Sequence, residues 1–489
     1  SDARGARITG GPVTGVSGSA SHDKTFLMAR LGSGERPLRV AVVGSGPSGF
    51  YAADALFKAG PRVTVGMFER LPTPYGLVRA GVAPDHPKIK SITRVFDRIA
   101  AESRFAFWGN VTVGRDVSVD ELRRYYDAVI FAYGAEKDRR LGIPGEDLPG
   151  SHTATDFVGW YNGHPDLRDR VFDLSHETAV VIGQGNVALD VCRILAKPAA
   201  ALSHTDIAQH ALVALARSRV RQIYVIGRRG PAQAKFASTE LKELADLAEC
   251  ELVVERQELG LDAASRAEAA HPNNIHARNN LALLEKIASR TPSAKSRRVV
   301  IRFLLTPVAV RGGAHVEAVR FERNELADQP FQLRAVRTGV EEEIPCGLLL
   351  RSVGYQGVPM PGVPFDSDQG VIPTRAGRVV DADVPVPGLY AAGWIKRGPR
   401  GVIGANKPDS AETVKSLLED LSGLAPCLEP DDAPLHTVLK GRGVRVVDYE
   451  GWKRIDAAET ARGHAVGKPR EKFTCIPDML EIVESSSGS

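Results

Sequence analysis

Short runs of hydrophobic residues alternate with helical patterns along most of the chain. The first run, residues 38–43, is rich in β-branched side chains and ends at a glycine. A helix-forming stretch, residues 50–58, follows it, and a second apolar run occupies residues 63–68. This strand–turn–helix–strand order predicts a βαβ unit, in which a helix joins two parallel strands.

The same order returns in the middle of the chain. A strand is expected at residues 178–182, a helix to about residue 196, an extra helical piece at 207–217 and a strand at 223–226. Further strands are expected at residues 110–113, 128–131, 299–304, 316–322, 332–337 and 388–392. Strands that alternate with helices predict an α/β fold with largely parallel sheets.

Both βαβ units carry a glycine-rich turn after their first strand. The first turn reads Gly44-x-Gly46-x-x-Gly49, and the second reads Gly183-x-Gly185-x-x-Ala188. The first glycine permits the tight turn, the second lets a pyrophosphate approach the backbone, and the third residue lets helix and strand pack closely. Each turn therefore predicts a dinucleotide site at a helix N-terminus.

The residues that end the second strand of each unit differ. Glu69 closes the first unit, 20 residues after Gly49, where an acidic residue accepts hydrogen bonds from a ribose. The second unit instead ends in Gly227, Arg228 and Arg229. A carboxylate repels a 2′-phosphate, whereas arginine binds it bidentately. The first site therefore suits FAD and the second NADP(H), with a plain surface carboxylate and two solvated arginines as the alternative interpretations.

Composition narrows the function classes. With 489 residues the chain is long enough for two or three domains, and a formal net charge of +4 argues against general nucleic-acid binding. The five cysteines form no Cys-x-x-Cys pair, which removes a redox dithiol and a cysteine-based metal site. No apolar run approaches the ~18 residues that a membrane span needs. We expect no metal site.

Several motifs together resemble the adrenodoxin reductase family, the NADPH:ferredoxin reductases with a glutathione-reductase-like plan of two domains. Trp394 after Gly393 is the most telling position, because related flavoproteins usually have aspartate there. The resemblance extends over residues 38–475. It is carried by residues 43–50, 74–79, 81–87, 157–162, 183–190, 227–231, 393–399 and 401–403.

The resemblance implies a domain plan. Residues 36–137 and 361–489 would form a discontinuous FAD domain, into which an NADP domain of residues 138–360 is inserted. Residues 1–35 would form a flexible extension. A monomer is expected, and peripheral association with a membrane stays open.

The resemblance also implies site residues. The predicted FAD contacts, beyond the first glycine turn, are Ser48, Glu69, Leu77, Val113, Trp394, Gly401, Val402 and Ile403. The predicted NADP contacts are Gln184, Gly185, Asn186, Val187, Arg228, Arg229, Glu240 and Gly401. Leu77, Val113 and Ile403 would equally serve as core residues.

His86 and Glu243 are the implied catalytic residues, for a proton path or for tuning the hydride step; a hydrogen-bonded loop histidine is the alternative for His86. The implied partner is an acidic [2Fe–2S] ferredoxin that docks on a basic face. Arg400 departs from the family, which usually has a small hydroxyl residue there.

The predicted activity is hydride transfer from NADPH to FAD, followed by single-electron transfer to the ferredoxin. A flavoprotein with a small-molecule acceptor such as a quinone is the closest alternative, and a non-catalytic nucleotide-sensing protein is a second one. The form of the C-terminal region favours the mitochondrial matrix over a bacterial-type cytoplasm.

Overall fold

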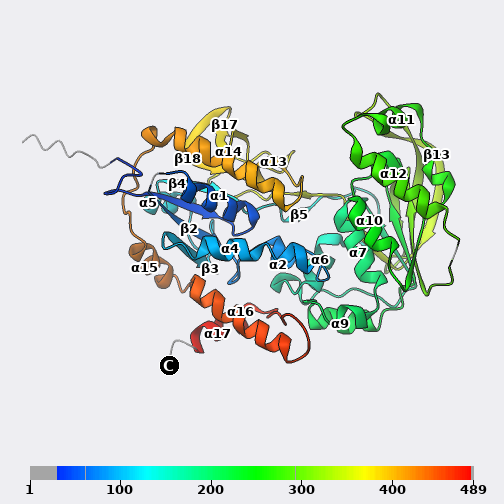
Figure 1. Cartoon of the computed structure of the whole chain (residues 1–489), viewed down its shortest axis with the longest axis horizontal. Helices are drawn as coiled ribbons and strands as arrows, with labels where there is room; N and C mark the ends of the chain where they lie inside the picture. The colour runs from blue at the N-terminus through cyan, green and yellow to red at the C-terminus, as the bar shows by residue number, and fades with distance from the viewer. Residues whose placement is uncertain (1–29, 61, 292, 486–489) are drawn as a thin grey trace, which may run out of the picture.

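The computed structural model describes residues 30–485, apart from residues 61 and 292. Two α/β bodies lie side by side, as Figure 1 shows. None of the helices in the described part of the chain is both long and apolar enough to cross a membrane.

The first body is built on a sheet of seven strands in the order β16-β17-β18-β4-β1-β2-β3. Strand β1 lies between β4 and β2 and runs parallel to both. The strand order changes direction at β1, so the glycine turn that follows this strand lies at a topological switch point of the sheet. The strands are β1 Leu38–Val43, β2 Val63–Glu69, β3 Phe105–Gly109, β4 Ala128–Phe131, β16 Thr374–Arg375, β17 Arg378–Asp381 and β18 Val384–Ala391. Its helices include α1 Pro47–Lys58, α4 Thr93–Ala100, α5 Val119–Tyr125, α13 Trp394–Arg397 and α14 Asn406–Glu419.

The second body is built on a sheet of six strands in the order β6-β14-β7-β8-β10-β9. Strand β7 pairs in parallel with β8 and β14, which repeats the arrangement around β1. The strands are β6 Ser151–Thr153, β7 Thr178–Ile182, β8 Gln222–Ile226, β9 Cys250–Val253, β10 Arg297–Arg302 and β14 Leu348–Arg351. Its helices include α6 Ala154–Tyr161, α7 Asn186–Ala196, α8 Ala199–Leu202, α9 Gln209–Ala216, α10 Ser238–Ala245, α11 Ala263–Ala270 and α12 Ile275–Ala288. A separate antiparallel sheet contains β11 Leu305–Arg311, β12 Ala318–Ala327 and β13 Arg334–Pro345.

We call the part built on the first sheet the first domain and the part built on the second sheet the second domain. The chain passes between them twice, through β5 Lys137–Asp138 and β15 Tyr355–Gln356, which pair antiparallel. The predicted fold class, with one dinucleotide-binding domain inserted into the other, is confirmed. The residue boundaries stay a prediction. Most of the predicted N-terminal extension lies outside the described residues. Leu31, near the end of that extension, is buried in the hydrophobic core of the first domain.

One local expectation was wrong. The strand expected at residues 110–113 is instead β3, because Asn110 has a φ of +59° and ends the extended backbone. The segment between β2 and α4 contains two short helices, α2 Leu77–Ala80 and α3 Pro87–Lys90. The described part of the C-terminal region contains the helices α15 Ala433–Gly441, α16 Tyr449–His464 and α17 Ile476–Ser485.

Candidate active site

The first glycine turn is shaped by two close backbone approaches. A Cβ on Gly44 would lie 2.6 Å from the carbonyl oxygen of Ala132, and Gly44 has a φ of +106°. A Cβ on Gly49 would lie 2.1 Å from the carbonyl oxygen of Gly44. At Gly46, by contrast, no heavy atom lies within 4 Å of that position. The turn is therefore closed by protein at its ends and open in the middle, where a pyrophosphate would approach.

Glu69 stands beside this turn as the last residue of β2. Its carboxylate accepts a hydrogen bond from Ser45 Oγ at 2.6 Å and one from the backbone N–H of Leu71 at 3.1 Å. These bonds fix the carboxylate at the edge of the turn. The buried Ser48 is held by a hydrogen bond of 3.0 Å between its Oγ and Asn406 Oδ1.

The second turn has the same construction. A Cβ on Gly183 would lie 2.1 Å from the carbonyl oxygen of Ser352, whereas the space at Gly185 is open. Gln184 donates to the carbonyl of Arg302 at 2.9 Å, and Asn186 Oδ1 accepts from the N–H of Ala237 at 2.7 Å. Val187, the next residue of α7, packs against the hydrophobic core of the second domain.

Arg228 and Arg229 follow β8 at the same edge. Arg228 is exposed and Arg229 half-buried, and neither guanidinium forms an ion pair with a carboxylate of the described residues. Burial and the positive charge of Arg228 lower the pKa of Arg229, while Glu268 acts in the opposite direction. Asn324 donates to the carbonyl of Arg228 at 2.8 Å and fixes the backbone there. Two adjacent guanidiniums without a paired acid can bind a phosphate.

Trp394 lies where β18 gives way to α13. Gly393 has a φ of +77°, and a Cβ there would lie 2.0 Å from Ser48 Oγ, so the turn before Trp394 is pressed against α1. The indole stacks on Tyr355 with ring centroids 5.6 Å apart. Its Nε1 is buried and has no hydrogen-bond partner among the described residues.

The remaining predicted FAD contacts divide into two kinds. Leu77 is 46 % exposed and Val402 is 68 % exposed, which is high for apolar side chains beside a core. Val113 is only 8 % exposed and belongs to the first domain's core, and Ile403 packs against that core. Gly401, with a φ of +82°, begins the turn that carries Val402. The alternative interpretation, that these residues belong to the core, therefore fits Val113 and Ile403 better than it fits Leu77.

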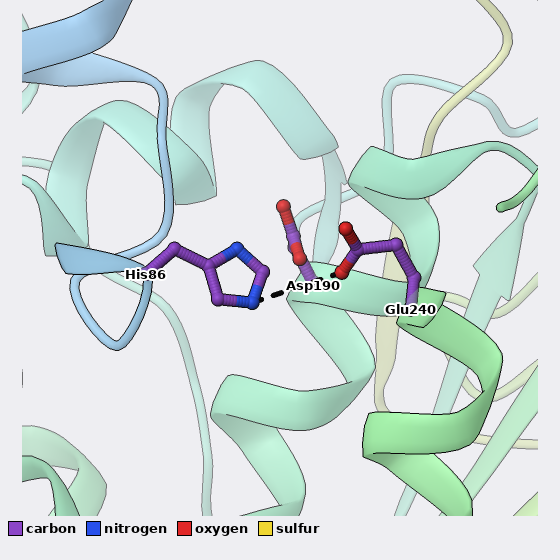
Figure 2. A group of neighbouring side chains, drawn as sticks. All are labelled: His86, Asp190 and Glu240. Atoms are coloured by element: carbon purple, nitrogen blue, oxygen red, sulfur yellow. Dashed lines mark ion pairs between the residues drawn. The ribbon is translucent and has the colours of Figure 1, made fainter. Parts of the chain in front are cut away.

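The two predicted catalytic residues meet between the domains, although they lie 157 positions apart. His86 Nε2 lies 2.7 Å from Glu243 Oε2 and 3.7 Å from Glu240 Oε2. Figure 2 shows His86 from the first domain facing Asp190 on α7 and Glu240 on α10. The predicted NADP contact Glu240 thus lies in the same cluster as His86.

Three further residues of this cluster were missed by sequence reasoning. Arg193, only 1 % exposed, forms two hydrogen bonds to Asp85 of the first domain, at 2.8 and 3.0 Å, and lies 2.8 Å from Asp190. Burial would raise the pKa of Asp85, but the hydrogen bonds from Arg193 and Lys197 outweigh it and lower that pKa. The signal was a pair of charges, Asp190 and Arg193, inside an otherwise apolar helix.

His86, Asp190 and Glu240 are arranged as in a cation-binding site, but the guanidinium of Arg193 already lies beside the two carboxylates. Ligand atoms of His86, Asp190 and Glu240 lie within 4.8 Å of one another. Arg193 is 2.8 Å from Asp190 and 3.5 Å from Glu240, so a guanidinium already neutralises these carboxylates. Burial, followed by the charge of Asp190, raises the pKa of Glu240. The charges of this group form a network of ion pairs centred on Arg193.

Both turns fit the dinucleotides that the sequence implies. The open space at Gly46 and Gly185 is where pyrophosphates would contact backbone N–H groups of α1 and α7. The unpaired Trp394 Nε1 and the exposed side chains of Leu77 and Val402 offer one polar and two apolar contacts to a flavin. All five cysteines are unpaired, and none contributes to this site.

The fold and these sites define a flavoprotein oxidoreductase with two dinucleotide sites. Residues 35–237 match the sequence family described as pyridine nucleotide-disulphide oxidoreductase. NADPH-ferredoxin reductase FprA of Mycobacterium tuberculosis is 47 % identical over 459 residues, covering 91 % of this chain and 99 % of FprA. Human mitochondrial NADPH:adrenodoxin oxidoreductase is 45 % identical over 464 residues and covers 92 % of each chain.

The solved structure of M. tuberculosis FprA in complex with NADPH superimposes with a TM-score of 0.86 at 46 % identity, covering 92 % of this chain and 100 % of that one. The chain belongs to the adrenodoxin reductase family. Membership confirms the predicted enzyme class and the cofactors FAD and NADP, and it rules out the non-catalytic alternative. The bacterial relative is 47 % identical and the mitochondrial one 45 %, so the mitochondrial location is not confirmed.

Proposed function

We propose that this protein is an FAD-dependent NADPH:ferredoxin reductase. The observation that carries the proposal is the pair of glycine turns with different strand ends, one beside Glu69 and one beside Arg228 and Arg229, in domains that meet at His86 and Glu243. When bound, FAD accepts a hydride from NADPH and releases the two electrons singly, which suits a one-electron acceptor. The protein binds and orients both cofactors.

The second domain selects the nucleotide. Arg228 and Arg229 hold the 2′-phosphate of NADPH, and the open backbone at Gly185 receives its pyrophosphate. The hydrogen bonds that fix Gln184 and Asn186 keep this turn rigid before the nucleotide arrives. Preformed donors bind a phosphate without first paying an ordering cost.

The first domain holds the flavin. Glu69 accepts hydrogen bonds from the ribose, and Gly46 leaves space for the pyrophosphate. Trp394 Nε1 supplies a hydrogen-bond donor, and Leu77 and Val402 cover apolar surface. Gly401 places backbone between the two domains, where both cofactors would meet.

His86 and Glu243 hold a proton at His86 Nε2. The 2.7 Å contact between them lets Glu243 accept that proton or return it, while Arg193 and Asp85 keep the two domains in register around the pair. The side chain of Glu243 is half-exposed, so the pair is open to solvent on that side.

The acceptor is a [2Fe–2S] ferredoxin. The acidic surface of the ferredoxin would be attracted to a basic face of this protein. In line with the sequence, we propose a monomer. We place it in the mitochondrial matrix, with a bacterial-type cytoplasm as the alternative, and we propose that it can associate peripherally with a membrane.

NADPH-driven cytochrome c reduction tests the acceptor. Turnover should require added [2Fe–2S] ferredoxin and fall as salt rises, because salt screens the encounter of opposite charges. Equal turnover with a quinone and no ferredoxin would favour the flavoprotein with a small-molecule acceptor and overturn the proposal.

A further inference from the structure

The loop between α16 and α17 leaves the first domain and reaches the second near α9, as Figure 1 shows at the lower edge of the molecule. Lys468 donates to the carbonyl of Ile207 at 3.0 Å and to Gln209 Oε1 at 3.2 Å. A Cβ on Gly163 would lie 3.0 Å from Thr474 Cγ2, which shows how closely this loop packs on the second domain. The two domains thus have a second contact region, separate from the cluster around His86.

Lys472 on this loop bonds to both domains at once. Its side chain is 2 % exposed. The ammonium donates to the carbonyl of Arg79 in the first domain and to the carbonyl of Asn162 in the second, each at 3.1 Å. It also lies 3.1 Å from Asp206 Oδ2 in the second domain.

A second lysine of the first domain shares the same carboxylate. Lys90 Nζ lies 2.7 Å from both oxygens of Asp206 and 3.3 Å from Asn162 Oδ1. Two ammoniums from one domain therefore bind one buried carboxylate of the other. A buried ion pair adds little net stability compared with apolar packing, so orientation is the more natural role of this group.

The group is tied to the predicted site through short stretches of backbone. Arg79 lies on α2 together with Leu77, a predicted flavin contact, and its guanidinium is bidentate to the buried Glu459. Lys90 ends α3, for which His86 is the N-cap. Both segments that the lysines hold therefore lead directly to residues of the proposed active site.

We propose that Lys472 is a positioning residue for hydride transfer. By joining the Arg79 backbone to Asn162 and Asp206, it holds the second domain in one orientation against the first, so that the nicotinamide and flavin sites face each other. This inference rests on the proposed function. Misplacement of reacting groups by about 1 Å can cost about a hundredfold in rate.

The test is Lys472→Met in the full-length holoenzyme, with flavin reduction by NADPH followed in stopped-flow absorbance. We expect unchanged FAD content, a rate of flavin reduction about ten- to hundredfold lower, and a smaller change in the dissociation constant of NADPH. Lys453→Met is the matched control, because Lys453 is exposed on α16 and pairs only locally with Glu450. The control should behave as the wild type.

Two further measurements separate orientation from general destabilisation. Asp206→Asn should slow flavin reduction in the same direction, and the two effects should add only partly in the double variant, since the two variants share the contact between Lys472 and Asp206. Hydrogen–deuterium exchange at the paired crossovers β5 and β15 should rise in Lys472→Met and stay unchanged in Lys453→Met.

A wild-type rate of flavin reduction in both Lys472→Met and Asp206→Asn would overturn the inference. If Lys472→Met loses its flavin or does not fold, Asp206→Asn decides alone: a slower rate supports the inference and a wild-type rate overturns it. No ferredoxin is present in these assays. A wild-type enzyme that reduces its flavin but fails with ferredoxin would therefore contradict the proposed function and leave this inference standing.

Discussion

The two glycine turns have the same backbone plan and differ at the residue that closes them. At the first turn, a Cβ on Gly49 would lie 2.1 Å from a carbonyl oxygen, so glycine is obligatory. At the second turn the equivalent residue is Ala188, whose side chain is fully buried in the second core. The same fold therefore uses a tighter helix–strand contact for the predicted FAD site than for the predicted NADP site. The strand ends differ as well, with a carboxylate in one domain and two guanidiniums in the other.

Gly49→Ala should have the largest effect. The added methyl group must displace α1 from the turn, and overpacking costs about 1–3 kcal/mol, or about ten- to a hundredfold in FAD affinity. The flavin absorbance per purified chain measures this. Ala188→Gly is the matched control, because it removes a methyl group at the equivalent position, and it should leave flavin content unchanged. Equal flavin content in both variants would contradict the comparison.

The Arg228→Ala and Arg229→Ala double variant should have the next largest effect. Because Arg228 is exposed and Arg229 only half-buried, the two together should contribute about 2 kcal/mol, so KM for NADPH should rise about thirtyfold while KM for NADH stays nearly constant. Steady-state kinetics with both nucleotides measure the ratio.

Arg311→Ala is the control for that variant, since Arg311 is exposed at the end of β11 in the same domain. Unchanged kinetics of the double variant with both nucleotides would refute the assignment of the 2′-phosphate site.

Glu69→Gln should have a smaller effect, because the amide keeps one acceptor oxygen, although it loses the charge and the second oxygen. We expect FAD to bind about tenfold more weakly, which corresponds to about 1.4 kcal/mol. Titration of the flavin-free protein with FAD gives the dissociation constant. Glu102→Gln, in the exposed turn before β3, should leave that constant unchanged. If the Glu69→Gln variant binds FAD as tightly as the wild type, the role of Glu69 in ribose binding is refuted. Glu69 would then only accept the hydrogen bonds from Ser45 and Leu71.

The sequence predicted the turns and their strand ends because each is a local pattern of a few residues with a fixed geometric meaning. His86 and Glu243 were predicted as catalytic residues through a family resemblance. Their contact was not predicted and could not come from spacing, since the two residues lie in different domains. Arg193 and Asp85, or Lys472 and Asp206, carry no local signal of their pairing. Such contacts depend on how the two domains pack, and a periodic pattern reports only the face on which a residue lies.

The contact between the domains gives a different kind of effect, a pH dependence of stability. Burial lowers the pKa of Lys472 to about 7; Asp206 opposes this shift, whereas Lys90 and Arg79 reinforce it. The ordinary value is 10.5, so between these two values the unfolded chain binds more protons than the folded one. The free energy of unfolding should therefore rise with pH across this window, and the cost of burying the charged ammonium is complete below it.

Comparison of the wild type with Lys472→Met isolates this contribution. The difference between their free energies of unfolding should shift in favour of the wild type between about pH 7 and about pH 9, by at most about 1.4 kcal/mol per pH unit. Denaturant titrations at several pH values measure it, and Lys453→Met should show no such trend. A difference that is flat or falls with pH would mean that Lys472 stays charged when buried, held by Asp206. The contact would then act as a permanent ion pair between the two domains, and their orientation would not respond to pH through this residue.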